Sequence, residues 1–493
     1  MHIVYIIGNH PLVDDLIRQY KAHDYEVHRY SMMDSNSISH ICCDELFLLS
    51  DFYNASDTEA DYAVIAQLTQ TAHYIANKGQ RVTCHLLIRN PKIYQKLLSS
   101  DFSETIRQKL DIYPFVLDEV WSRIIRLDYE PITIESEKHA HLVIFGMNQV
   151  AEMVAIQSAL VAHYPNFIPN HSKKTRITII DKHASLKCKD FISHYQHLFD
   201  NSFYSIINLT KAETTFHKPQ YDGVREEFVD VEWEFIEASS DNTVVREKLG
   251  LWSMDNKRLL TIVMSYKDSN QNINEALLMS DIIFHCTIPI YIYSQHEVSF
   301  DTSHNIIPFG MTDRGYNIKM PLVSMAKNVN YLYHLCYKEN IKEWTGQLRT
   351  AVEINKGDRD ALWGQLSISK RMSCIYHAMT VATKMRSIGL NEDDWEHFYD
   401  ISKQDVELLS EVEHNRWSID ELVLGWRPCT DDEQRQVEAD ITLKNELKKH
   451  RIHYDLRAYH DLRPDETGKP VEIYDICLCS SLPLIAKTFI EER

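Results

Sequence analysis

The first part of the chain alternates short apolar runs with amphipathic stretches. Strands are expected at "HIVYIIG" (2–8), "YEVHRYS" (25–31), "DELFLLSD" (44–51) and "QRVTCHLLIRN" (80–90), and "IYPFVLDEVWSRIIR" (112–126) reads as a strand followed by a helix. Between them, helical spacing of apolar residues predicts helices at 10–23 and at 60–79, the second ending at Gly79. Strands that alternate with helices predict a parallel sheet covered on both faces, here over residues 1–132, which we call the first unit.

Residues 139–345, the second unit, repeat this plan. Strands are expected at "HLVIFG" (141–146), "TRITIID" (175–181), "EWEFIEA" (232–238), "RLLTIVMSY" (258–266) and "IPIYIYS" (288–294), with helices at 148–164 and 272–286 and a long insertion after Asp181. A final apolar strand and helix follow at 305–337. The two units share their architecture but little residue identity.

The C-terminal segment, residues 358–493, has a different pattern. The run "ALWGQLSISKRMSCIYHAMTVATKMRSIGL" (361–390) is helical and ends near Gly389, and helix mixed with polar loops follows it. The whole pattern predicts an α/β protein with two Rossmann-like parallel-sheet units followed by a mainly helical domain.

Composition narrows the class of protein. Hydrophobic residues make up 44% of the chain and charged residues 25%, as in ordinary globular proteins. A net charge of −19 argues against a general nucleic-acid binder, which needs clustered Lys and Arg. No run approaches the roughly 18 apolar residues that a membrane helix needs, so no membrane insertion is expected.

The cysteines and the N-terminus both favour a cytoplasmic protein. Ten cysteines form no CxxC pair and no spacing typical of a disulfide framework, which predicts buried free thiols in a reducing compartment. The start "MHIVYIIGNHPLVDD" has no basic leader and no cleavage site, so it is interpreted as a first strand rather than a signal peptide. His194 and His197 in "HYQH" lack a third ligand nearby, so no metal site is predicted.

The second unit carries the better candidate for a nucleotide site. A Rossmann site uses G-x-G-x-x-G, so that the backbone can approach the pyrophosphate at a helix N-terminus. In "GMNQVA", Gly146, Asn148 and Ala151 fall on the three glycine positions, and Gln149 lies beside them. Asp181 ends the second strand, where an acid can bind a ribose hydroxyl, although its distance from Gly146 exceeds the usual spacing.

The first unit is a weaker candidate for the same chemistry. In "GNHPLV" only Gly8 fits a glycine position, with Asn9 next to it, and no acid ends the second strand. The chain has only 13 glycines in all. The alternative is that both sheets are scaffolds without a nucleotide.

On "VIFGMNQVA" and "ITIIDK", the paired plan resembles the RCK-like Rossmann domains that regulate Trk-type potassium uptake and potassium channels. The resemblance covers about 300 residues. It implies a bound NAD(P) or another nucleotide, and pairing of the units either within one chain or as a homodimer through apolar helices. Asn148 and the whole of "GNHPLV" depart from the family pattern.

The helix "DVELLSEVEHNRWSIDELVLGW" (405–426) carries the most unusual residues. Its main apolar stripe consists of Leu408, Val412, Ile419, Leu422, Val423 and Trp426. On a helical wheel, His414 and Trp417 project away from that stripe, so Trp417 needs a second partner in the protein or in a ligand. The carboxylates of "SEVEHNRW" and of "IRLDYE" (125–130) read as solvated faces.

The same helix carries a motif. "EVEHNRW", then "LGW", then "HYDLRAYHDL" and a late "YD" resemble the RyR domain, the repeat named after ryanodine receptors, over about 130 residues. Position by position, the family pattern falls on the residues that we call the RyR-like motif: Glu413, His414, Arg416, Trp417, Gly425, Trp426, His453, Leu456, Tyr459, Leu462 and Asp475. We expect Arg416 to pair with Glu413 or Asp475, and Trp417 to pack on the 453–462 loop. The motif is then either an aromatic and polar core or part of a ligand pocket.

Three functional hypotheses follow. The first is a cytosolic, non-catalytic regulatory protein that senses a nucleotide and is coupled to a ligand- or partner-binding RyR domain. The second is an NAD(P)-dependent enzyme, which is disfavoured because no Tyr–Lys or His–acid pair accompanies a good glycine loop. The third is an interaction scaffold or effector in a bacterial stress or anti-phage system.

Overall fold

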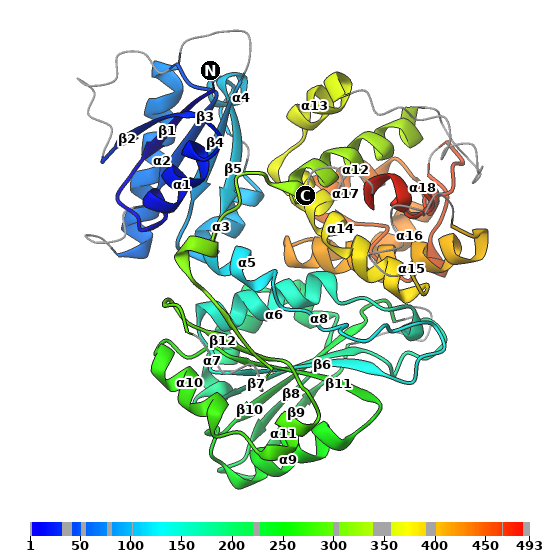
Figure 1. Cartoon of the computed structure of the whole chain (residues 1–493). Helices are drawn as coiled ribbons and strands as arrows, with labels where there is room; N and C mark the ends of the chain where they lie inside the picture. Colours follow the sequence, from blue (N-terminus) through cyan, green and yellow to red (C-terminus); the bar gives the residue numbers. More distant parts are fainter. Residues whose placement is uncertain are drawn as a thin grey trace.

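The computed structural model describes residues 2–31, 42–50, 56–75, 81–100, 102–219, 227–298, 305–338, 356–390, 401–465 and 467–486. Figure 1 shows two sheet-containing units and a third body built of helices, packed together around a common centre. The expected helix end at Gly79 lies outside the described residues.

The first unit contains a five-stranded parallel sheet in the order β2-β1-β3-β4-β5. Its strands are β1 (Ile3–Ile7), β2 (Glu26–Tyr30), β3 (Glu45–Leu49), β4 (Val82–Leu87) and β5 (Leu110–Phe115). Its helices are α1 (Leu12–Lys21), α2 (Asp57–Tyr74), α3 (Pro91–Leu98), α4 (Glu104–Lys109) and α5 (Leu117–Ser122). This order is the flavodoxin-like variant of the doubly wound sheet, with its switch point between β1 and β3.

The second unit contains an eight-stranded sheet in the order β13-β12-β11-β6-β7-β10-β8-β9. Its strands are β6 (His139–Phe145), β7 (Thr175–Asp181), β8 (Phe203–Asn208), β9 (Glu213–His217), β10 (Val231–Glu237), β11 (Arg258–Met264), β12 (Ile290–Tyr293) and β13 (Ile306–Phe309). The six strands from β13 to β10 have the Rossmann order 6-5-4-1-2-3. The insertion after β7 adds β8, parallel to β10, and the antiparallel β9 at one edge.

Helices cover both faces of this second sheet. They are α6 (Gln149–Val161), α7 (Ala184–His194), α8 (Gln196–Asp200), α9 (Thr243–Met254), α10 (Ser269–Leu277) and α11 (Asp281–His285), with short 3-10 turns η1 (Pro165–Phe167) and η2 (Thr312–Arg314). Side chains alternate between the faces. Leu142 and Ile144 of β6 join the core on the α6 side, whereas Val143 and Phe145 pack with residues of α9, α10 and α11. Buried side chains on both faces explain why the parallel strands read as continuous apolar runs.

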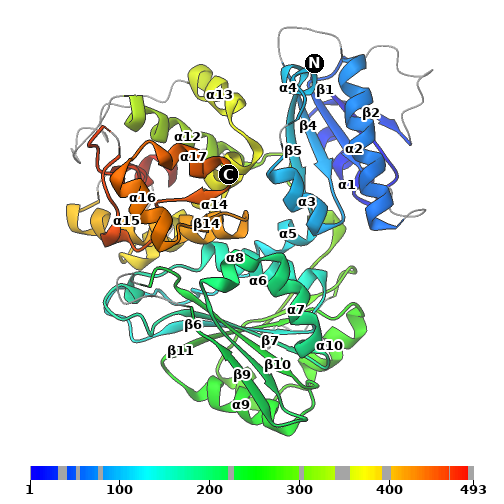
Figure 2. The ribbon, with the colours of Figure 1, turned by 180° about the vertical axis from the view of Figure 1, so that it is seen from behind.

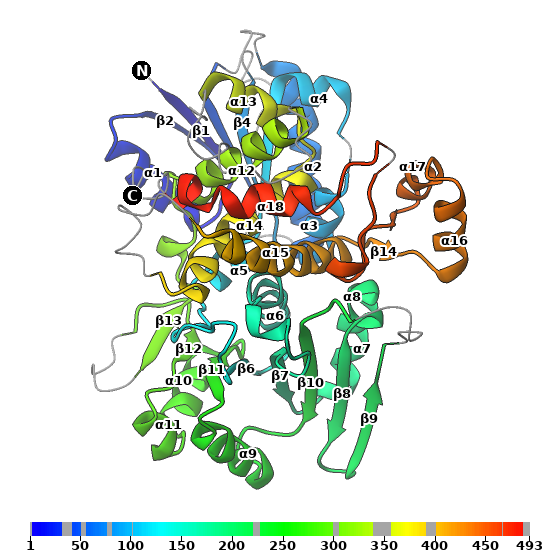
Figure 3. The same cartoon turned by 90° about the vertical axis from the view of Figure 1, so that its right-hand side faces the viewer.

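The helical region consists of α12 (Pro321–Lys338), α13 (Lys356–Gln365), α14 (Ile368–Ser387), α15 (Lys403–Val423), α16 (Asp431–Ala439), α17 (Leu443–Lys449) and α18 (Ile473–Ser480), with the short pieces β14 (Arg427–Pro428), β15 (Ile452–His453) and η5 (Tyr459–Asp461). Helix α12, which the sequence pattern placed at the end of the second unit, packs against α13, α14 and α18. Figure 3 shows α15 and α18 running side by side above α6. The α/β class with a helical C-terminal part is therefore confirmed.

Helix α6 lies at the centre of the molecule. It contacts α5 of the first unit and α14 and α15 of the helical region, and its other side lies on β6 and β7. Figure 2 shows α6 between its own sheet and the two other parts of the chain. Its sequence "QVAEMVAIQSALV" is apolar around most of the circumference, and ten of its thirteen residues are buried. A helix that is hydrophobic on all sides needs such a buried place.

The connection from β13 to α12 packs against the first unit through Tyr316. The Tyr316 hydroxyl is hydrogen-bonded to Nδ1 of His85, 2.6 Å away. The Tyr316 ring stands edge-on to Phe47 and packs against Phe115, with centroid distances of 5.6 and 4.7 Å. The side chain of Gln19 also donates to the Tyr316 carbonyl, at 2.7 Å. A residue from far along the chain thus completes the core of the N-terminal sheet.

Candidate functional site

The switch point of the second sheet lies between β6 and β11. These neighbouring strands run parallel and end at the same edge, where β6 leads through Gly146 into α6 and β11 leads through Ser265 into α10. In open α/β sheets, ligands bind in the crevice at such a point. The structure brings the predicted Gly146, Asn148, Gln149, Ala151 and Asp181 together at this edge.

Gly146 makes the tight turn that opens α6. Its φ is +89°, and a Cβ atom there would lie 3.0 Å from Cδ1 of Tyr266. Asn148, at the second glycine position of the motif, is the N-cap of α6, and its Oδ1 accepts a hydrogen bond from Ala151 N at 3.1 Å. The Asn148 side-chain amide donates to the Ser265 carbonyl. The asparagine therefore ties the helix start to the neighbouring strand end.

Asp181 joins two turns at the same edge. Its carboxylate accepts hydrogen bonds from the backbone N–H groups of Met147 and His183, at 2.9 and 2.8 Å, and lies 2.8 Å from Nζ of Lys187. The residue is only 7% exposed. An acid at this position can bind a ribose hydroxyl, and here it also fixes the β6–α6 turn by bonding to it.

Tyr266 covers the crevice, and the sequence pattern did not single it out. Its ring lies against Gly146, and its hydroxyl is hydrogen-bonded to Ser240, beyond the end of β10. Burial, chiefly, raises the pKa of Tyr266 to about 12. Asn272 holds the Tyr266 backbone, accepting from its N–H and donating to its carbonyl, each at 2.8 Å. Rotation of this one side chain would open the space above Gly146.

Gln149 connects the crevice to the first unit. Its amide donates to the Arg89 carbonyl at 2.6 Å and to Oδ2 of Asp118 at 2.9 Å. Burial raises the pKa of Asp118 to about 6. A second hydrogen bond between the units runs from the indole N–H of Trp121, in the first unit, to the carbonyl of Met311, in the second, at 3.0 Å. The expected contact between the two units is present; a homodimer stays a prediction.

The corresponding turn of the first unit is tighter. Gly8 has φ +133°, and a Cβ there would lie 2.3 Å from the Leu49 carbonyl oxygen. Asn9 follows it and is partly buried, and His10 Nδ1 accepts from Leu12 N at 3.1 Å in the first turn of α1. Burial lowers the pKa of His10 to about 4. The histidine thus occupies the start of α1 where a phosphate would bind.

The residues of the RyR-like motif meet in one place. His414 and Trp417 of α15 lie 5.5 Å apart between ring centroids, and His453 stands edge-on to Trp417 at 4.9 Å. Tyr459 lies 5.8 Å from His414 and Trp426 lies 5.6 Å from His453. Leu456 and Leu462 are buried nearby in the same loop, and Gly425, with φ +85°, ends the helix. The predicted packing of Trp417 on the 453–462 loop is confirmed through His453, and Trp417, which was expected to be mostly buried, is partly buried.

His414 joins α15 to two other segments. Its Nε2 lies 2.9 Å from the Arg457 carbonyl and its Nδ1 lies 3.4 Å from Oδ2 of Asp475 on α18. Because a carbonyl can only accept, Nε2 carries a proton, and Nδ1 faces a carboxylate. Burial acts to lower the pKa of His414, but Asp475 and the Arg457 carbonyl outweigh it and raise that pKa above its usual value.

A buried ionic cluster lies on the adjacent face of α15. Glu413 accepts from Nζ of Lys384 at 2.6 Å and from Nε of Arg416 at 3.0 Å, and His377 Nδ1 lies 2.9 Å away. Asp420 lies 3.6 Å from Nη1 of Arg416. Burial acts to raise the pKa of Glu413, but the neighbouring cations hold it well below its usual range. The expected Arg416–Glu413 pair is confirmed.

The expectation of solvated carboxylates is wrong for Glu413 and Asp128, whereas Glu130 is exposed. Glu413 is only 1% exposed and Asp128 only 4%. Asp128 lies in the segment before β6, and it accepts a hydrogen bond from Nε of Arg386 on α14 at 2.9 Å. This bond holds the two segments together. Buried carboxylates need such partners, because an unpaired charge is costly to bury.

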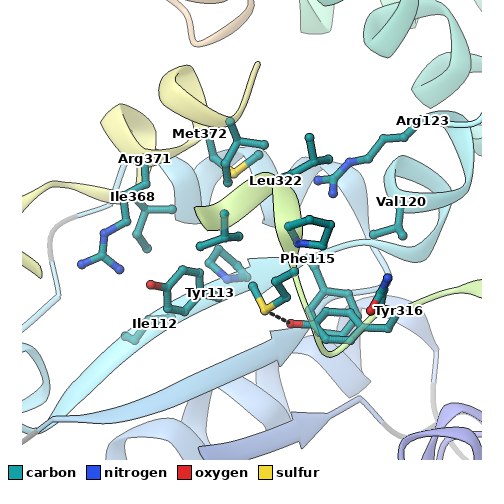
Figure 4. Close-up of a pocket in the computed structure, with 16 residues that line it drawn as sticks. Ile112, Tyr113, Phe115, Val120, Arg123, Tyr316, Leu322, Ile368, Arg371 and Met372 are labelled. Carbon is teal, nitrogen blue, oxygen red and sulfur yellow. Dashed lines mark hydrogen bonds between the residues drawn. The ribbon is translucent and has the colours of Figure 1, made fainter. Parts of the chain in front are cut away.

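A cavity of about 260 Å³ lies where the first unit meets the helical region (Figure 4). Figure 4 shows Arg371 and Arg123 on opposite sides of it. Both guanidinium groups already pair with carboxylates, Arg371 with Asp111 and Arg123 with Glu119. The other lining residues are mostly apolar: Ile112, Tyr113, Pro114, Phe115, Val120, Tyr316, Asn317, Met320, Pro321, Leu322, Val323, Ile368, Met372 and Ile375. The cavity is smaller than the roughly 300–1,000 Å³ of common ligand pockets.

Comparison with known proteins adds no identification. No family model matches the chain, and no curated protein matches it. Among the described residues, no three or more His, Cys, Asp and Glu side chains gather as metal ligands. In the same part of the chain, no helix has the length and apolar character needed to cross a membrane.

The sequence-based prediction missed the partners that come from other segments. Lys384 and His377 belong to α14, which also carries the charged residues Lys370, Arg371 and Arg386. His377, Thr380 and Lys384 are spaced three and four residues apart, and this spacing places them on one helix face. This spacing was the only local signal, and the other charged residues of the helix obscure it. Tyr266 and Asp118 gave none, because their role depends on the packing of distant segments.

Proposed function

We propose that this chain is a non-catalytic regulatory protein of the cytoplasm that binds a nucleotide, NAD(P) or a related one, in the crevice of the second unit. The observation that carries the proposal is the Rossmann strand order with Gly146, the start of α6 and Asp181 at its switch point. The helix N-terminus suits a phosphate group and the acid suits a ribose. The ten free thiols suit a reducing compartment.

Binding would require Tyr266 to turn away from Gly146. Its hydroxyl would exchange the Ser240 hydrogen bond for water or for the ligand, while the Asn272 bonds keep the backbone in place. The ligand would then lie beside Gln149, whose amide bridges to Asp118 of the first unit. Since α6 also packs against α14 and α15, a shift of α6 would act on the helix that carries the RyR-like motif.

A second candidate function is an interaction scaffold. It is favoured by a specific observation: the Asp181 carboxylate is already bonded to Met147, His183 and Lys187, and Tyr266 fills the space above Gly146. A sheet whose site groups satisfy one another needs no ligand to be stable.

Thermal unfolding of the full chain with NAD, NADP, ATP and cyclic nucleotides tests the proposal. A ligand at 100 times its Kd stabilises the folded state by about 2.7 kcal/mol, so Tm should rise. Asp181→Asn should reduce the rise, because the amide is a poorer acceptor for a ribose hydroxyl. Asp255→Asn is the matched control, because Asp255 lies between α9 and β11, at the amino ends of the strands and away from the crevice. This variant should keep the full rise in Tm. No rise with any nucleotide at millimolar concentration would favour the scaffold.

A further inference from the structure

Two buried thiols face each other between α12 and α18. Cys336 lies near the end of α12 and Cys477 in the middle of α18, and their sulfur atoms are 2.6 Å apart. The two residues are 0% and 3% exposed. A disulfide has an S–S bond of about 2.05 Å, so the pair needs a movement of only about half an ångström to form one. Neither residue belongs to the nucleotide crevice or to the RyR-like motif.

The surroundings make the two thiols unequal. The Cys477 thiol donates to the Cys336 sulfur. Lys469, itself only 2% exposed, donates from Nζ to the Cys336 carbonyl at 3.2 Å. Its ammonium also lies 4.5 Å from the ring centroid of Tyr474. The bond from Cys477 lowers the pKa of Cys336, assisted by Lys469 and opposed by burial. Cys336 is thus the better thiolate, and thiolates are the reactive form.

We propose that Cys336 and Cys477 are an oxidation site at which hydrogen peroxide forms a reversible disulfide between α12 and α18. The Cys336 thiolate attacks one peroxide oxygen, the O–O bond breaks, hydroxide leaves, and Cys336 becomes a sulfenic acid. The Cys477 sulfur then loses its proton and attacks the Cys336 sulfur. The S–O bond breaks, water leaves, and the S–S bond forms. In total, two thiols and one peroxide give one disulfide and two waters.

The burial of Cys336 and Cys477 limits which oxidants can reach their thiols. Glutathione disulfide or a protein disulfide must bring its own sulfur to the attacking thiolate. Cys336 and Cys477 are only 0% and 3% exposed, which leaves no room for that approach. Hydrogen peroxide is close to water in size. Apolar neighbours, chiefly Ile473, Tyr474 and Ile476, enclose the pair and keep it apart from the other cysteines.

The disulfide would act on α18. This helix also packs on α15. Asp475 of α18, two residues before Cys477, lies next to His414 of α15. A covalent bond on the α12 side restrains α18 between its two neighbours. Oxidation would therefore fix the position of Asp475 against His414 of α15. This inference does not depend on nucleotide binding by the second unit.

Thiol counting and peptide mapping of the peroxide-treated full chain test the proposal. Thiols titrated after unfolding should fall from ten to eight, with a peptide pair linked through Cys336 and Cys477 that dithiothreitol separates. Cys479→Ser, on the same helix and equally buried, is the matched control and should still lose two thiols. Cys477→Ser should form no such link, and dimedone added as the peroxide-treated chain is unfolded should trap the sulfenic acid at Cys336.

Two results would overturn the proposal. One is a full count of ten thiols after treatment with excess peroxide. The other is a disulfide that joins other cysteines while the peptides of Cys336 and Cys477 stay unlinked. Both are read on the unmutated protein, so they do not depend on whether a variant folds. Glutathione disulfide in a parallel sample should give no 336–477 link, and an equally fast link would overturn the assignment to peroxide.

Discussion

Replacing Glu413 with Gln removes the central anion of the buried ionic cluster. In the parent, Lys384 and Arg416 each contact Glu413, and Asp420 supplies the second negative charge beside Arg416. The amide keeps the shape of the side chain but not its charge, so one buried cation loses its counterion. Breaking a buried ion pair in this way costs about 3–5 kcal/mol. We therefore expect Glu413→Gln to lower the free energy of unfolding by that amount.

The double variant Lys384→Met with Glu413→Gln separates charge from packing. It removes one cation and one anion together and leaves Arg416 with Asp420, so the buried charges balance again. We expect its loss of stability to be smaller than the sum of the two single losses by about 0.5–3 kcal/mol, the size of the coupling in contacting pairs. Urea unfolding of the full chain, monitored by circular dichroism, measures both changes in stability. The comparison requires that the slope of the unfolding free energy against urea concentration is the same in each variant. Strict additivity of the two single substitutions would refute the reasoning.

Three further predictions follow from the structure. Trp417→Ala should cost about 3 kcal/mol, the low end for Trp truncation, because the side chain is partly buried; urea unfolding checks it. The pKa of His414 is higher in the folded protein than the 6.5 of the unfolded chain, so protonation of His414 stabilises the fold. This stabilisation is fully present below pH 6.5 and is lost as the pH rises above the folded-state pKa. Tm should therefore fall as the pH rises from about 6.5 through the folded-state pKa of His414, and fall less in Asp475→Asn. Gly8→Ala should destabilise by more than about 1 kcal/mol, since its Cβ would meet Leu49; a Tm equal to the parent's would contradict this.

The sheets were predictable because their signals are local. Runs such as "HLVIFG" and "TRITIID" are apolar on both faces, and the structure has β6 and β7 there. The hairpin of β8 and β9 was missed, because the β9 run "ETTFH" is mostly exposed and has no clear alternation. The predicted helix at 272–286 is two helices, α10 and α11, because Ser280 begins a new one in an extended conformation.

The candidate site was predictable only in part, for a related reason. Gly146 and Asp181 follow apolar strands directly, so their positions at the sheet edge could be read from the sequence. Tyr266 reaches across from another strand, and Asp118 belongs to another unit. The pairing of Glu413 with Arg416 follows from helical spacing, whereas its contact with Lys384 depends on how α14 and α15 pack.

The contribution of Tyr316 to the first unit bears on synthesis of the chain. Tyr316 follows its hydrogen-bond partner His85 by 231 residues. At a translation rate of roughly 5–20 residues per second, this interval takes on the order of ten to fifty seconds. For that time the emerging N-terminal sheet lacks the ring that packs against Phe47 and Phe115. Its apolar surface stays open to chaperones, and the last step of its folding waits for a segment made after the whole second sheet.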